Sequence, residues 1–212
     1  TSIAHITLLK TEAFESTNMK DLVKKALADR HAAVREHGAI LSERYPETKE
    51  ALAGLLNDQA PRVAFQATLS LGQFNDANTI NLLTNILEKN SADPWFRMAV
   101  LSSNAGSSYE LFKSLNKTAF FDAYNDDKAQ LIKDLAFILT KRDQSVDKFV
   151  KDLEAISKGK NENKWLLGAI EGMEKASKDG LKNLAVKATL QSIMESTTDQ
   201  DVKTKLSQLL KS

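Results

Sequence analysis

The three histidines are the residues of this sequence best suited to bind a metal or to transfer protons near neutral pH. His31 and His37 are six residues apart, whereas a zinc-binding pair on one helical face needs a spacing of four. Glu36 adjoins His37 but lacks the metalloprotease spacing, and His5 lies far away along the chain. We therefore predict that the histidines lie at the surface or in turns, and that the chain binds no metal.

The other residue types that commonly carry catalysis form no recognisable motif. The absence of cysteine excludes disulfides, thiolate zinc sites, iron–sulfur clusters, covalent c-type haem and a cysteine nucleophile. The sequence contains neither a glycine-rich phosphate loop nor a Gly-x-Ser-x-Gly nucleophile elbow. Asp126 and Asp127 form a carboxylate pair, but adjacent acids in a polar stretch more often cap the helix that follows. We predict no catalytic residue and no cofactor, so the chain is not expected to be an enzyme.

Candidates for binding a partner are four aromatic residues, namely Trp95, Phe120, Phe121 and Tyr124. Trp95 follows Pro94 in the first turn of a predicted helix, where it either contacts a partner or packs against the next repeat. Phe120, Phe121 and Tyr124 lie in an irregular region. They form either a plug in the core or a patch that faces a partner, and both alternatives stay open at the level of sequence.

Composition narrows the partner classes. Hydrophobic residues make up 42% of the 212 residues, which is enough for a folded core. Only 8 glycines and 3 prolines are present, which argues against an all-β fold with its many turns. The net charge of +1 provides no general attraction for nucleic acid or an anionic membrane, and no apolar run approaches the ~20 residues of a membrane span. We expect the partners to be proteins or neighbouring domains of the same chain, with no nucleic acid and no membrane contact by this segment.

Three segments of the N-terminal half align at a near-constant spacing. With Val34, Val63 and Phe96 taken as equivalent, the spacings are 29 and 33 residues, and Pro61 coincides with Pro94. A repeat of this length is typical of a solenoid, in which each helical pair contacts only its neighbours.

Apolar residues spaced three and four apart predict amphipathic helices along the whole chain. The predicted helices other than the three aligned segments lie at 19–27, 47–56, 79–87, 128–140, 146–156, 164–175, 181–194 and 202–210. Breaks are expected at 104–108 and 158–163. The pattern predicts an all-α, right-handed α-α superhelix of about six helical pairs, a HEAT-like solenoid. We expect one domain over 1–212, cut from a larger multidomain protein.

The turns between the helices of a pair carry a HEAT-like signature, an aspartate followed by Val-Arg at 29–35. The aspartate is expected to cap a helix, and Arg35 to brace the turn or pair with an aspartate of the adjacent repeat. Ala64 occupies the arginine position of the second repeat, so an unbroken arginine ladder is not expected. Asp93 precedes Pro94 and is predicted to cap the third of these helices.

The same periodicity predicts which side of a helix is buried. Val63, Ala67 and Leu71 share one face of the second aligned helix and are expected to pack into the stack. Arg62 and Gln66 fall on the other side, and we expect them to face solvent.

Two stretches are more specific, PRVAFQATLSLG at 61–72 and DPWFRMAVLSS at 93–103. They resemble the HEAT-repeat region of large bacterial membrane-bound dehydrogenases, which join a sugar-dehydrogenase-like β-propeller, this helical region and a c-type cytochrome domain. The resemblance is best over 19–103. The family's haem-attachment motif is absent because the chain has no cysteine, and no propeller is present. The resemblance therefore implies neighbouring domains and a periplasmic setting, but no activity of this chain.

Two function classes follow. The first is a non-catalytic protein-interaction scaffold, or a spacer between the domains of a dehydrogenase/cytochrome protein. The alternative is a HEAT-like alkylpurine DNA glycosylase, which needs a basic surface for phosphate contacts. Residues 1–106 carry 11 basic and 12 acidic residues, and residues 107–212 carry 18 basic and 16 acidic residues. Neither half therefore has the excess of positive charge that such a surface needs. A bilin-lyase-like HEAT protein shares only the fold.

Overall fold

A computed structural model describes residues 19–103, 107–142, 145–160, 163–177 and 181–211. Contacts within the chain divide it into two compact units, Thr1–Asn104 (unit 1) and Ala105–Ser212 (unit 2). The single domain expected over 1–212 stays a prediction, and each unit is described here by itself.

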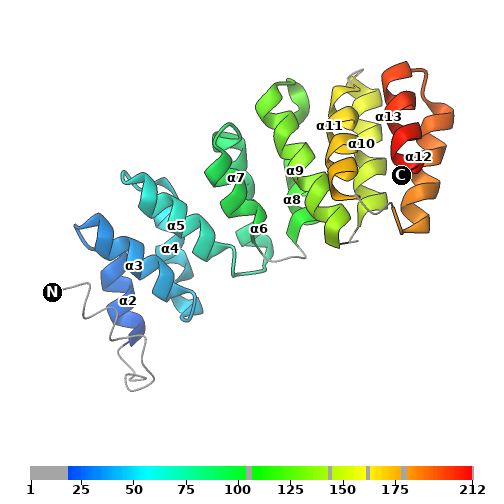
Figure 1. The fold of residues 1–212 in the computed structure, drawn as a ribbon. Helices are drawn as coiled ribbons and strands as arrows, with labels where there is room; N and C mark the ends of the chain where they lie inside the picture. Colours follow the sequence, from blue (N-terminus) through cyan, green and yellow to red (C-terminus); the bar gives the residue numbers. More distant parts are fainter. Residues whose placement is uncertain (1–18, 104–106, 143–144, 161–162, 178–180, 212) are drawn as a thin grey trace. The chain divides into compact units, whose positions relative to one another are not determined.

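Unit 1 consists of three helical pairs joined by short turns (Figure 1). The pairs are α2 (Met19–Leu27) with α3 (Ala32–Ser42), α4 (Lys49–Gly54) with α5 (Pro61–Leu71), and α6 (Ala77–Asn90) with α7 (Pro94–Leu101). Single 3₁₀ turns, η2 (Pro46–Thr48) and η3 (Leu55–Asn57), extend α4 at both ends. The second helices of the pairs pack in sequence, α3 on α5 and α5 on α7, and we call them the second-helix layer of unit 1.

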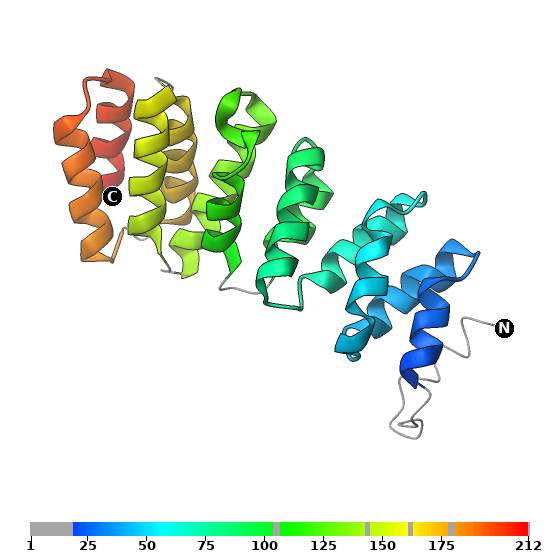
Figure 2. The ribbon, with the colours of Figure 1, turned by 180° about the vertical axis from the view of Figure 1, so that it is seen from behind.

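Unit 2 repeats the scheme with three further pairs (Figure 2). They are α8 (Ser107–Leu115) with α9 (Asp126–Arg142), α10 (Val146–Lys160) with α11 (Lys164–Ala176), and α12 (Leu184–Ser196) with α13 (Gln200–Lys211). The short helix η4 (Ala119–Asp122) lies between α8 and α9. Here α9, α11 and α13 form the second-helix layer, with α11 packed against both of the others. Across the described ranges the chain has no β-strand, so the predicted all-α class with six HEAT-like pairs is confirmed.

Helix α5 shows how the apolar spacing becomes a core. Val63, Ala67 and Leu71 are all fully buried, as predicted, and Arg62 is exposed. Gln66 differs from the expectation, because it is half-buried and its amide donates to Ser70 Oγ at 3.0 Å. Periodicity predicts the direction in which a side chain leaves the helix, but not whether a hydrogen bond to a neighbouring polar group will keep it close to the helix surface.

Helix α8 is the element that the sequence analysis missed. The stretch 104–108 is predicted to be a break, yet the helix begins at Ser107. Leu111, Phe112 and Leu115 are fully buried at helical spacing, which was the available signal. The second predicted break, 158–163, is wrong over 158–160, because α10 continues to Lys160. Residues 104–106 and 161–162 lie outside the described part of the chain.

Candidate functional site

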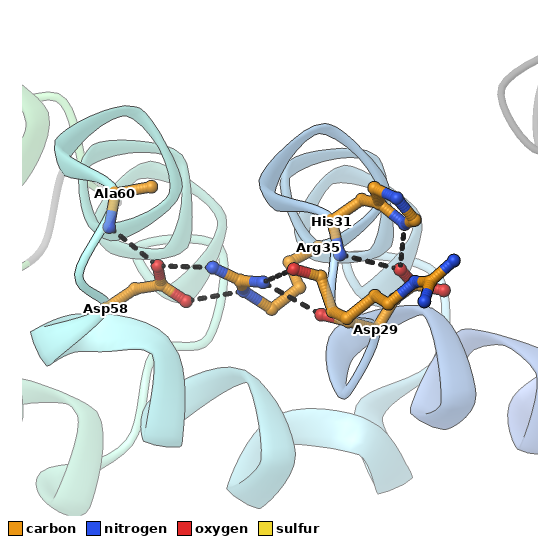
Figure 3. Close-up of polar contacts among 6 residues, drawn as sticks. Asp29, His31, Arg35, Asp58 and Ala60 are labelled. Atoms are coloured by element: carbon orange, nitrogen blue, oxygen red, sulfur yellow. Dashed lines mark hydrogen bonds and ion pairs between the residues drawn. The ribbon is translucent and has the colours of Figure 1, made fainter.

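Arg35, in the first turn of α3, has a guanidinium group that makes four hydrogen bonds (Figure 3). Its Nε and Nη2 donate to the two carboxylate oxygens of Asp58 at 2.7 and 2.8 Å. Its Nη1 donates to the backbone oxygens of Asp29 and Arg30 at 2.8 and 3.1 Å. A bidentate contact of this kind joins the first repeat to the second, as the sequence predicts.

The side chain of Asp58 is 7% exposed, and its carboxylate also accepts from the Ala60 amide at 2.8 Å. The hydrogen bond from Arg35 holds the pKa of Asp58 below its usual value, so the carboxylate stays charged at neutral pH. Both of its oxygens are engaged by structural partners. This arrangement braces the repeats and presents no nucleophile or general base.

The third repeat has an equivalent contact between an arginine and the backbone of the preceding turn, but a serine replaces the aspartate there. Arg97 Nη1 donates to the Ser91 backbone oxygen at 2.6 Å, six residues before it, as Arg35 does to Asp29. Ser91 is therefore the equivalent of Asp29. Asp93 is instead a true N-cap, with extended backbone and a carboxylate that accepts from the Trp95 amide at 2.8 Å. The predicted cap is confirmed.

His31, and not Asp29, is the N-cap residue of α3, and its exposed side chain makes no capping hydrogen bond, so the predicted cap at Asp29 is wrong. Its amide donates to Asp29 Oδ1 at 2.8 Å, and its ring nitrogen Nδ1 lies 3.1 Å from the same oxygen. Among the described residues no three His, Asp or Glu side chains gather as a metal site would require. Nor does any helix in those ranges have the length and apolarity to cross a membrane.

The second-helix layer of unit 1 has an outward side that we call the unit 1 face. Counting from the equivalent positions Val34, Val63 and Phe96, it consists of the residues one before, two after and six after each. All of these residues are exposed or half-buried. They are Ala33, Glu36 and Ile40 of α3, Arg62, Phe65 and Leu69 of α5, Trp95 and Met98 of α7, and Ser102, which directly follows α7.

The unit 1 face becomes apolar towards α7. Trp95 is 63% exposed and Met98, one turn later on the same helix, is 51% exposed. Phe65 stands edge-on to the Trp95 ring, with ring centroids 6.5 Å apart and planes at 90°. At the other end of the face, near α3, Arg62 Nη2 donates to Glu36 Oε1 at a distance of 2.9 Å. Exposed apolar side chains that adjoin one another, as Trp95 and Met98 do, can mark an interaction surface.

The remaining candidate aromatics lie in unit 2, and two of them are buried. Phe120 and Phe121 are almost fully buried, with ring centroids 6.1 and 5.1 Å from that of Trp165. Helix η4 turns both rings into the core of the unit. The core plug is therefore the alternative that the geometry favours for this pair, because the rings offer almost no surface to a partner.

Tyr124 lies at the edge of this aromatic cluster. Its ring centroid is 5.0 Å from that of Trp165, and Lys164 Nζ lies 4.9 Å above it. It lines a surface hollow of about 280 Å³ between α9 and α11, together with Ala129, Gln130, Lys133, Gly168, Glu171 and others.

The structure thus brings three of the four predicted residues together in unit 2, while Trp95 lies in unit 1. The sequence analysis missed Met98 and Phe65 as companions of Trp95. Met98 could have been found from its spacing of three from Trp95, and Phe65 from its equivalence to Met98 in the repeat. The partner-binding role of Trp95 stays a prediction.

Comparison with known proteins agrees with this repeat structure. No curated protein matches the chain. The family described as HEAT repeats matches residues 19–103, which are the described residues of unit 1 and less than half of the chain. Residues 19–103 are therefore similar in sequence to HEAT repeats, and they fold as the three helical pairs described above.

Proposed function

We propose that this protein is a non-catalytic interaction scaffold that binds a protein partner on the unit 1 face. HEAT repeats are generally protein-interaction scaffolds, because stacked helical pairs present a long continuous surface. The observation that carries the proposal is the exposure of Trp95 and Met98 on adjacent turns of α7.

The chemistry of these side chains suits a protein partner. Tryptophan is enriched among the residues that dominate interface energies, and a flexible methionine adapts to irregular surfaces. The edge-on contact with Phe65 limits the ring's freedom before binding, which lowers the entropy lost on association. Fully burying an aromatic side chain of this kind contributes roughly 1.5–3 kcal/mol.

A finer form of the proposal places the chain between redox domains. The resemblance at 61–72 and 93–103 supports a docking or spacer role in a periplasmic dehydrogenase/cytochrome protein. The reading frame on both sides of 1–212 tests this form, since a frame that encodes neither a propeller nor a cytochrome contradicts it.

The absence of cysteine allows a site-specific test of the unit 1 face. A photo-crosslinker on Met98→Cys should capture a discrete partner from an extract of the source organism. The matched control is Leu184→Cys, because Leu184 is 79% exposed but lies in unit 2. Unlabelled parent protein should abolish the crosslink, and unlabelled Trp95→Ala should compete at least tenfold less well. Equal capture from both positions, or full competition by Trp95→Ala, contradicts the proposal.

A further inference from the structure

The hollow of unit 2 lies between two helices that run in the same direction. Gly168 lies against the backbone oxygen of Ala129, and Gly172 against that of Lys133. From the first contact to the second, the position moves four residues towards the C-terminus in both helices, so α9 and α11 are parallel at these contacts. The hollow opens beside this seam and measures about 280 Å³.

The two glycines of α11 differ in what packing demands of them. A Cβ on Gly172 would lie 2.2 Å from the Lys133 backbone oxygen, so only glycine fits there. A Cβ on Gly168 would lie 3.4 Å from the Ala129 oxygen, an ordinary contact. A glycine in a helix interior destabilises the helix relative to alanine. Packing therefore does not explain Gly168, whose side of the helix lines the hollow.

The lining of the hollow has charged ends and a nearly apolar middle. Ala129, Leu167 and Gly168 line its middle together with the amide of Gln130. At one end Lys133 Nζ donates to Glu171 Oε2 at 2.7 Å. This hydrogen bond holds the pKa of Glu171 below its usual value, so its carboxylate is charged at neutral pH.

The opposite end also presents both signs of charge. Asp126 and Lys164 are the first residues of α9 and α11, and both line the hollow beside the Tyr124 ring. Asp126 precedes Lys133 by seven residues, as Lys164 precedes Glu171, so the two ends are about 10 Å apart along the helices.

We propose that this hollow binds a short zwitterionic peptide of two or three residues with free termini. An extended chain advances 3.3–3.6 Å per residue, so a peptide of this length spans about 7–10 Å between its terminal charges. Its ammonium group is placed at a carboxylate of one end and its carboxylate at the lysine of the other. Small side chains of the peptide lie beside Gly168, which has no side chain of its own in the lining of the hollow. The proposal concerns unit 2 and does not rest on the partner proposed for unit 1.

Amide NMR spectra of the full chain provide the direct test. Titration with Ala-Ala-Ala should shift the resonances of Ala129, Gln130 and Gly168 and leave those of unit 1 unchanged. The same peptide with an acetylated amino terminus and an amidated carboxyl terminus should bind at least tenfold more weakly, and free alanine should bind more weakly too. No shift at millimolar Ala-Ala-Ala, or equal binding of the capped peptide, overturns the proposal.

Substitutions of Gly168 separate the hollow from the packing of α11. Gly168→Ala should raise the Tm by up to about 4 °C, while weakening Ala-Ala-Ala binding severalfold. Gly168→Leu should abolish binding. Gly54→Ala is the control, because Gly54 lies in unit 1 and a Cβ there would contact nothing. This variant should bind Ala-Ala-Ala as the parent does. A fall in Tm for Gly168→Ala would show that packing requires this glycine, and would overturn the argument.

Discussion

The second-helix layers of the two units use aromatic side chains in opposite ways. In unit 1, Trp95 stands on the outward side of α7, mostly in water. In unit 2, Trp165 is fully buried on α11, surrounded by Phe120 and Phe121. Since aromatic burial is among the largest contributions to a core, a repeat that leaves its tryptophan exposed forgoes that stabilisation.

The charged contacts between neighbouring second helices complete the contrast. In unit 2, Lys133 of α9 bonds Glu171 of α11, and Lys205 of α13 lies 3.7 Å from Glu174 of α11. In unit 1, an ion pair between Arg62 and Glu36 also joins α5 to α3, but the contacts between α5 and α7 include the edge-on rings of Phe65 and Trp95. The comparison teaches that one fold can present an apolar surface in one unit and a charged surface in the other.

The two tryptophans offer the most direct way to break this comparison. Trp165→Ala should destabilise the protein by about 3–5 kcal/mol, because it leaves a large cavity in the core of unit 2. Trp95→Ala should cost less than about 1 kcal/mol, since most of the ring is already in water. Urea melts of both variants measure the difference. Similar losses in the two would mean that the rings do not play opposite roles.

Arg35 and Arg62 of unit 1 sharpen the distinction between an arginine that joins two repeats and one at the surface. Arg35→Ala should lower the urea midpoint clearly, because it leaves the Asp58 carboxylate, whose side chain is 7% exposed, without its charged partner. Arg62→Ala should cost under about 0.5 kcal/mol, because its side chain is 85% exposed and its bond to Glu36 lies in water. Urea midpoints compare the variants, and an Arg62→Ala loss as large as that of Arg35→Ala contradicts this account.

The cap of α7 supports the helix that carries the unit 1 face. Asp93→Ala should cost about 0.5–2 kcal/mol, and Asp93→Asn less, because an amide oxygen still accepts from the Trp95 amide. Urea melts at neutral pH test this. An unchanged midpoint and slope for Asp93→Ala would show that the cap contributes nothing and would direct attention to this Asp-Pro-Trp corner as a binding site.

The smallest expected effects concern pH, and they have opposite signs in the two units. In unit 1, the hydrogen bond from Lys49 and the Thr79 amide lower the pKa of Asp76 to about 2. The folded-state pKa is depressed, so this contribution is present above pH 4 and lost as pH falls towards 2. In unit 2, burial and the hydrogen bond to Asp152 raise the pKa of Tyr109 to about 12. That contribution is present below pH 10 and lost as pH rises towards 12.

Two variants isolate these groups. Asp76→Asn should reduce the loss of stability between pH 4 and 2, and Tyr109→Phe the loss between pH 10 and 12. Thermal melts across both ranges follow the change. If either variant has the same pH dependence as the parent, the group it replaces does not titrate as described.

The sequence by itself determined the repeats, most helices and the local turns. Buried Val63, Ala67 and Leu71, and the cap at Asp93, follow from spacings within a few residues, because a helix repeats every 3.6 residues and leaves its first amides unpaired. The Arg35–Asp58 contact was also predictable, since a repeat of fixed length brings equivalent turns together.

The tertiary structure alone decided where the aromatic rings go. Nothing local distinguishes exposed Trp95 from buried Phe120 and Phe121, because burial depends on which helices pack above each ring. Periodicity did not indicate the Gln66 hydrogen bond to Ser70 one turn away, and it did not reveal that Gly168 lies against the backbone of α9. A side chain's direction is set by its own helix, but its exposure is set by contacts with residues far along the chain.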